Sequence, residues 1–219
     1  MPRLLFEKTG NAVWISHLDL MRLFQRTFKR AELPLKHTQG FNPRPSVSIA
    51  LPLSVGVESQ CELLDFELVE CPVTNAQILQ RLNEKLVDGI KVLDVYDNGR
   101  KTGLFSLLNC QILLEYDKGL PDGVCDRLAA LFSTDKLIVP KKTKSGIQEQ
   151  DIIPMVRQIS VTETGEKAVI IDALICCQNP TLNPAQLTAA IDRYLPDDSA
   201  DAVSYRRLEI YDNSEMIFR

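Results

Sequence analysis

The sequence has few of the residues that metal sites require. Its six cysteines include no C-x-x-C pair, and His17 and His37 are its only histidines. Zinc and iron–sulfur sites need clustered ligands, so this spacing argues against both kinds of site. We expect reduced structural cysteines, because free cysteine is commonly buried, and we expect no metal or other cofactor. The adjacent Cys176 and Cys177 leave a vicinal redox pair as the lesser alternative.

Long apolar segments are also missing. The two most apolar stretches, residues 168–177 and 47–53, each contain a polar residue and are far too short to cross a bilayer. The first eight residues carry charge where a signal peptide continues its apolar run, and no small-residue cleavage site follows. These absences predict a cytoplasmic protein without a membrane segment.

Familiar catalytic and nucleotide-binding motifs are absent as well. The sequence has no Walker loop, G-x-G-x-x-G, G-x-S-x-G or H-E-x-x-H motif. It also lacks the C-x-x-x-C-x-x-C motif that holds a radical SAM cluster. An independent catalytic activity is therefore the less favoured interpretation.

What remains is an ordinary globular composition with an uneven distribution of charge. The 219 residues are 45% hydrophobic and 25% charged, enough to bury a core without a disulfide or a metal. The net charge of −4 disfavours a general nucleic-acid binder. From Arg22 to Arg44, however, there are six basic residues and one acid, whereas Glu58 to Glu70 holds five acids and no base. Such asymmetry supports a local electrostatic site in an acidic protein.

The first 97 residues show the pattern of a ferredoxin-like half, with the order strand, helix, strand, strand, helix, strand. Ser16 is the expected start of the first helix and Pro34 its end, and Thr74 with Gln77 caps the second helix. Apolar residues at helical spacing give the first helix one stripe: Leu20, Met21, Phe24, Phe28 and Ala31. The expected extended segments are residues 3–8, 13–15, 47–51, 64–68 and 90–96.

A turn-rich segment, residues 97–103, separates a second half over residues 104–219. The second half nearly repeats the first, with strand, helix, short strand, a polar loop at 141–146, a hairpin, a helix and a final strand. The sequence therefore predicts an α+β protein with two ferredoxin-like (βαββαβ) halves, 1–97 and 104–219, of which the second is less regular.

The polar side of the first helix is the clearest candidate site. Its basic residues recur every three or four positions and are expected to share the face opposite the apolar stripe: Arg22, Arg26, Lys29 and Arg30. Such a row can contact successive phosphates, because affinity for nucleic acid comes mainly from phosphate neutralisation. A solvated helix face is the equally weighted alternative, although such faces usually mix charges of both signs.

The loop from Gly40 to Pro45 is the second candidate. Its two prolines and its glycine favour a rigid connection that holds Phe41, Asn42 and Arg44 in fixed directions. Phe41 is suited to stack on a base, and Asn42 and Arg44 to donate hydrogen bonds. The alternative is a plain helix-to-strand connection with Phe41 in the core.

Three other charged segments are weaker candidates. Ser16, His17 and Asp19 suggest a catalytic triad, but triad members normally come from separate segments, and helix capping accounts for the serine and the aspartate. His17 remains a candidate anion-binding residue and a weak candidate general acid or base. The lysines of the polar loop, Lys141, Lys142 and Lys144, are suited to clamp a nucleic-acid backbone, although such loops are usually disordered surface. The acidic run from Glu58 is expected mostly on the outer face of a strand.

The first third of the chain closely resembles a known family. The residues that carry the likeness are Phe6, Lys8, Gly10, the run Ser16-His17-Leu18-Asp19-Leu20, Arg22, Arg26, Lys29-Arg30-Ala31, Leu33-Pro34, Gly40-Phe41-Asn42-Pro43-Arg44-Pro45, Pro52-Leu53, Gly56, Ser59, Glu62 and Asp65. They resemble the radical-SAM-associated family of unknown function, in its stand-alone form. A later segment, Asp151 to Pro154, resembles Asp-Ile-Arg-Pro, but Ile153 stands where arginine is expected.

The resemblance implies a radical SAM protein as partner. Together with the basic helix, it favours an accessory protein that binds RNA, either tRNA or rRNA. The alternatives are a docking or substrate-presenting subunit without affinity for nucleic acid, and an RNA-processing enzyme that uses His17.

Overall fold

The computed structural model describes residues 1–70, 72–97, 99–143 and 146–219, so that Cys71 and Lys144 lie outside the described residues. The chain divides into two compact units, Met1–Gly103 with Arg219, and Leu104–Phe218. Both units combine helices with an antiparallel sheet, and the α+β class predicted from the sequence is confirmed. None of the helices in these ranges is long and apolar enough to cross a membrane.

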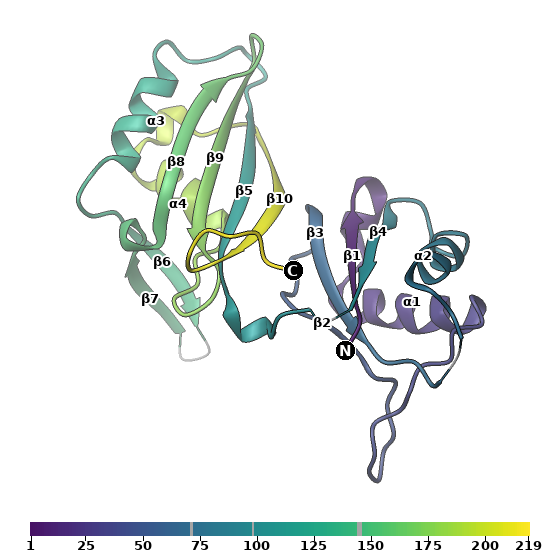
Figure 1. Cartoon of the computed structure of the whole chain (residues 1–219). Coiled ribbons are helices and arrows are strands. Elements are labelled where there is room, and N and C mark those ends of the chain that lie inside the picture. The colour runs from purple at the N-terminus through teal and green to yellow at the C-terminus, as the bar shows by residue number, and fades with distance from the viewer. Residues whose placement is uncertain (71, 98, 144–145) are drawn as a thin grey trace. The chain divides into compact units, whose positions relative to one another are not determined.

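The first unit has the ferredoxin-like arrangement (Figure 1). Its elements are β1 (Arg3–Lys8), the 3-10 turn η1 (Gly10–Trp14), α1 (His17–Arg30), β2 (Val47–Ile49), β3 (Val57–Phe66), α2 (Asn75–Asn83) and β4 (Ile90–Tyr96). The strands pair antiparallel in the order β4-β1-β3-β2. Of residues 13–15, expected to be extended, Val13 and Trp14 belong to the 3-10 turn and only Ile15 is extended; its N–H bonds back to the carbonyl of Ala12 and closes the turn.

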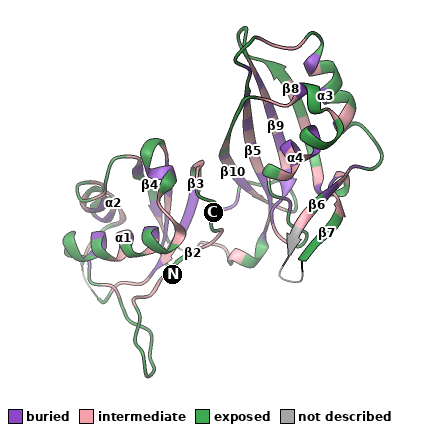
Figure 2. Cartoon of the chain, turned by 180° about the vertical axis from the view of Figure 1, so that it is seen from behind, coloured by how far each residue is buried: buried purple, intermediate pink, exposed green. Residues whose placement is uncertain are grey.

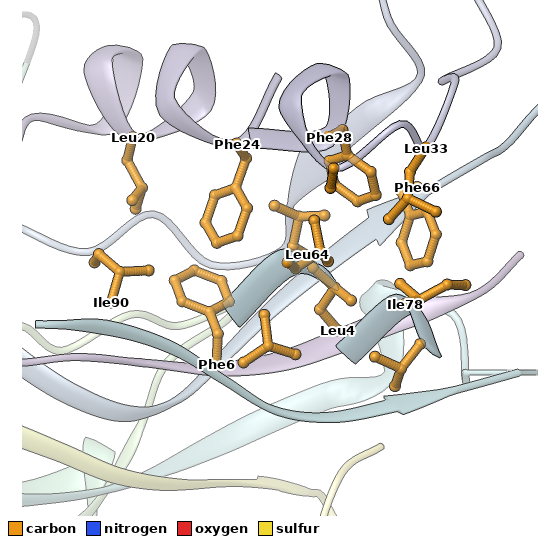
Figure 3. Packing of buried hydrophobic residues seen from close by; sticks show 14 of the residues in the cluster. Leu4, Phe6, Leu20, Phe24, Phe28, Leu33, Leu64, Phe66, Ile78 and Ile90 are labelled. Carbon is orange, nitrogen blue, oxygen red and sulfur yellow. The ribbon is translucent and has the colours of Figure 1, made fainter. Parts of the chain in front are cut away.

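Helix α1 packs its apolar stripe on the sheet of the first unit. The Ser16 hydroxyl accepts a hydrogen bond from the Asp19 amide, which confirms the predicted cap. Figure 3 shows Phe24 and Phe28 pointing toward the strands. The ring centroid of Phe24 lies 4.8 Å from that of Phe6, and the ring centroid of Phe28 lies 5.0 Å from that of Phe66. Burying one side of α1 in this way presents its opposite side to solvent.

The second unit repeats the arrangement with one insertion. Its elements are η2 (Thr102–Leu104, at the boundary), β5 (Phe105–Glu115), α3 (Val124–Phe132), β6 (Ile138–Thr143), β7 (Gly146–Asp151), η3 (Ile153–Met155), β8 (Val156–Glu163), β9 (Ala168–Cys176), α4 (Ala185–Tyr194), η4 (Pro196–Asp198) and β10 (Ala202–Asp212). The main sheet has the order β10-β5-β9-β8, which matches that of the first unit position by position.

The insertion is the β6–β7 hairpin, and it corrects the polar loop expected at 141–146. Lys141 and Lys142 lie in β6, paired with Gln148 and Ile147 of β7. Cross-strand backbone hydrogen bonds thus extend the short strand predicted before this loop, and polar composition alone did not reveal the pairing. Four of the cysteines (Cys61, Cys110, Cys176 and Cys177) are buried, which agrees with a structural role.

Candidate nucleic-acid interface

The outer face of α1 carries three exposed cations in a row. Arg22, Arg26 and Lys29 are exposed and lie opposite the buried stripe; Figure 2 shows that α1 has a large exposed part. Arg22 pairs with Asp19 at 2.9 Å, and the Ser16 hydroxyl, followed by this guanidinium, lowers the pKa of the Asp19 carboxyl. In the part of the chain that the structure describes, the side chains of Arg26 and Lys29 form no hydrogen bond or ion pair. Their charges are therefore available to a ligand.

Arg30 does not belong to this row, contrary to the sequence prediction. Its guanidinium donates a hydrogen bond of 2.7 Å to the carbonyl of Lys85, just beyond α2. It also lies 3.5 Å from the hydroxyl of Thr27. Helix geometry turns Arg30 about 80° away from Arg22, toward the neighbouring helix, so the row has three members.

The loop between α1 and β2 is an antiparallel hairpin, residues 36–46, that extends away from the unit (Figure 1). Backbone hydrogen bonds of 2.8 Å join Thr38 to Arg44 and Ser46 to Lys36 across it. Gly40, at φ +136°, supplies the backbone geometry of the turn. Phe41 is fully exposed, with Asn42 and Arg44 exposed beside it, so the alternative of Phe41 in the core is wrong.

A shallow groove of about 370 Å³ joins the helix to the hairpin. Its lining comes from the end of α1 and the base of the hairpin: Gln25, Lys29, Glu32, Leu33, Pro34, Leu35, His37 and Pro45. Its apolar part is leucine and proline, and its polar part is lysine, histidine, glutamine and the acidic Glu32. An apolar surface flanked by a cation is suited to a planar group attached to an anion.

His17 lies at the opposite end of α1 from this groove. It is the first helical residue, and its side chain forms no hydrogen bond within the described ranges. Ser16 and Asp19 bond to each other at 2.8 Å as part of the helix cap. The structure therefore does not bring His17 to the Gly40–Pro45 loop, about 21 Å of helix away.

The lysines of the second unit are separate from this surface in the chain. Lys141 donates to the carbonyl of Thr181 at 3.3 Å, which ties the β6–β7 hairpin to the loop after β9. Lys144 is outside the described residues. The described residues contain no group of three or more His, Cys, Asp or Glu side chains that could hold a metal.

The sequence prediction missed a buried charged pair beneath η1. Lys8 and Glu62 are each only 1% exposed, so Glu62 is not on the outer strand face where the acidic run was expected. The Lys8 ammonium donates to the carbonyls of Val13 at 3.1 Å and Ile15 at 2.8 Å. Burial lowers the pKa of Lys8, and the nearby carboxylate of Glu62 opposes that shift. The alternation Leu4, Phe6, Lys8 already placed Lys8 on the core side of β1.

Comparison with known proteins gives a family and a fold. A family model described as "Uncharacterized protein conserved in bacteria (DUF2344)" matches residues 2–184. No curated protein matches the chain in sequence. A chain in the "Crystal Structure of a Cbf5-Nop10-Gar1 Complex" aligns with 95% of this chain at 9% identity and a TM-score of 0.51. Only 48% of that longer chain is covered, and the likeness supports the α+β fold alone. An unknown protein from Galdieria sulphuraria aligns with 94% of this chain and 96% of its own length at 9% identity, with a TM-score of 0.26.

Proposed function

The chain belongs to the DUF2344 family of conserved bacterial proteins, and we propose that its first unit binds RNA, either tRNA or rRNA, as an accessory protein. The proposed surface consists of the row Arg22, Arg26 and Lys29, the groove at the end of α1, and the hairpin that carries Phe41, Asn42 and Arg44. We call these three parts together the α1–hairpin surface. Catalysis is not part of the proposal, since Ser16 and Asp19, the polar groups next to His17 in the chain, are engaged in the helix cap.

One observation carries the proposal: the α1–hairpin surface combines cations that lack ion pairs with a fully exposed phenyl ring. Arg26, Lys29 and Arg44 form no side-chain ion pair or hydrogen bond among the described residues. Each phosphate that such a cation neutralises releases counterions, which favours binding. Phe41 adds a stacking face at the end of a hydrogen-bonded hairpin, where little conformational entropy is lost on binding.

The test is binding of fluorescently labelled tRNA and a single-stranded rRNA fragment at two salt concentrations. Four phosphate contacts, by Arg22, Arg26, Lys29 and Arg44, predict a slope of about −2.8 in log affinity against log salt, or roughly fiftyfold between 50 and 200 mM. The double variant R22A/R26A should reduce that slope by about 1.4. A matched control, K118A/K136A, removes two exposed lysines of the second unit and should leave binding unchanged.

The outcomes separate RNA from other ligands. Binding that R22A/R26A leaves intact would show that RNA contacts another surface. Absence of binding at low salt would reject the RNA proposal and favour a surface that docks a protein or presents a substrate.

We propose further that a radical SAM protein is the partner of this accessory protein. The support is the resemblance of residues 6–65 to the radical-SAM-associated family. Affinity purification of the tagged chain from a bacterial lysate should recover a radical SAM protein. Repeated recovery without one would contradict the partnership.

A further inference from the structure

An exposed apolar patch lies at the other end of α1 from the groove. Trp14 is 70% exposed, and Leu18 and Val55 are exposed to 66% and 53%. Leu18 shares the outer face of α1 with Arg22, one turn further along the helix. The patch therefore begins where the row of cations ends.

Trp14 is held firmly although its ring is exposed. Lys8 donates to the carbonyls of Val13 and Ile15, the residues on either side of Trp14. The amide of Gly56 donates to the carbonyl of Val13 at 2.9 Å. A Cβ at Gly56 would lie 3.4 Å from Cζ3 of the indole, so the glycine lets the loop after β2 lie close beside the ring.

Burying Lys8 to hold the backbone around Trp14 costs free energy, although the exposed Trp14 side chain contributes little to the core. Desolvating the Lys8 ammonium is unfavourable, and the two carbonyls and Glu62 offset that cost in order to fix η1. A tryptophan held in place by buried groups, with most of its ring in solvent, is preorganised for a ligand that covers an aromatic face.

We infer that Trp14 stacks on a base of a single-stranded RNA segment that runs along α1 toward the groove. This inference rests on the proposed function and adds a residue, a direction and a strandedness to it. The cations between Trp14 and the groove match the phosphates of such a strand in charge. The helix is about 21 Å long, the span of about six stacked nucleotides at ~3.4 Å each. In a duplex both faces of each base are covered by neighbours, so stacking on Trp14 requires a single strand.

Trp14 is the only tryptophan of the chain, so its fluorescence reports directly on this contact. We would titrate the full chain with an oligouridylate of about twelve nucleotides, twice the span of the helix, and with its duplex with oligoadenylate. Anisotropy of the labelled RNA measures binding, and quenching of indole emission by the unlabelled RNA measures stacking. Quenching and anisotropy should saturate together with the single strand, and the duplex should bind more weakly.

The variant W14L should weaken single-strand binding about tenfold, whereas W14F, which retains an aromatic face, should lose less. Y194L, which removes an exposed tyrosine of the second unit, is the matched control and should bind like the parent. RNA binding without quenching, and with W14L equal to the parent, would overturn this inference and leave the proposed function standing. Equal affinity for the duplex would also overturn it. Absence of all RNA binding would reject both proposals.

Discussion

The two units share one topology but use their cations differently. In the second unit two arginines form ion pairs: Arg127 binds the buried carboxylate of Asp198 at 2.6 Å, and Arg193 pairs with Glu149 at 2.9 Å. In the first unit, Arg26, Lys29 and Arg44 lie outside any described pair, whereas Arg22 pairs with Asp19 and Lys36, at the base of the hairpin, lies 3.8 Å from Glu67. The first unit also contains the largely buried pair Arg3–Asp65 at 2.6 Å, so what distinguishes it is the group of exposed cations on its α1–hairpin surface.

Within the first unit, single cations differ in the same way. Lys8 is buried, and its hydrogen bonds fix η1 in the first unit. Arg26, on the same unit, is exposed and fixes nothing among the described residues. Removing a cation that supports the fold should therefore lower the stability of the protein. Removing a cation that is available to a ligand should lower the affinity for that ligand and leave stability unchanged.

The largest expected effect is that of K8M. The variant removes both hydrogen bonds to η1 and leaves the Glu62 carboxylate buried without the Lys8 charge, so we expect the free energy of unfolding to fall by about 3 kcal/mol. Chemical denaturation followed by circular dichroism measures it. K91M, which changes an exposed lysine of β4, should stay within about 0.5 kcal/mol of the parent. A K8M variant as stable as K91M would contradict the role assigned to Lys8.

The comparison of paired and unpaired charge is tested by D198N and R26A. Asp198 accepts two short hydrogen bonds from Arg127 and is nearly buried, so D198N should lower the free energy of unfolding by about 2 kcal/mol. R26A should change stability by no more than about 0.5 kcal/mol, yet weaken RNA binding. The contrast between the units fails if D198N is neutral, or if R26A destabilises the protein while RNA affinity is unchanged.

An exposed apolar side chain occurs in each of two hairpins: Phe41 in the hairpin of residues 36–46 and Ile147 in the β6–β7 hairpin. Both are largely exposed, so neither F41A nor I147A should change the midpoint of thermal unfolding measurably. F41A should weaken single-stranded RNA binding about tenfold through the loss of one stacking contact. I147A should bind like the parent in the same anisotropy assay. An equal loss of RNA affinity in F41A and I147A would contradict a specific role for the hairpin of the first unit in RNA binding.

The smallest effect is expected for G56A. Gly56 has φ +84°, a backbone conformation that costs an alanine about 1 kcal/mol, and its new methyl group would contact the Trp14 ring. G165A, in the β8–β9 turn at φ +73° with open space around it, imposes similar backbone strain without that contact. Both should lose stability, but only G56A should shift the emission of Trp14. A shift in G165A alone, or in neither variant, would argue against the close approach at Gly56.

Much of the fold could be predicted because it depends on local pattern. The stripe that buries Leu20, Phe24 and Phe28 follows from helical spacing, and Ser16 and Thr74 form the caps expected from their residue types. The strand order of the first unit follows from the order of elements along the chain. These features need no information about distant neighbours.

The remaining features depend on tertiary neighbours that the sequence does not specify. Arg30 leaves the basic row because the carbonyl of Lys85, far along the chain, lies within reach. Glu62 is in the core because β3 is a central strand of its unit and Lys8 lies nearby. Trp14 is exposed because hydrogen bonds from Lys8 and Gly56 hold η1 in place. The sequence does not indicate this exposure, since a tryptophan between two apolar residues is typical of a buried position.

The central claim, that the first unit and not the second contacts RNA, is tested most directly by photo-cross-linking. A single-stranded RNA containing 4-thiouridine would be bound to the full chain, irradiated, and the cross-linked peptides identified by mass spectrometry. We predict cross-links on the peptides that contain Trp14 and Phe41, and their loss in R22A/R26A. Cross-links confined to residues 104–218, with unchanged yield in R22A/R26A, would contradict the account.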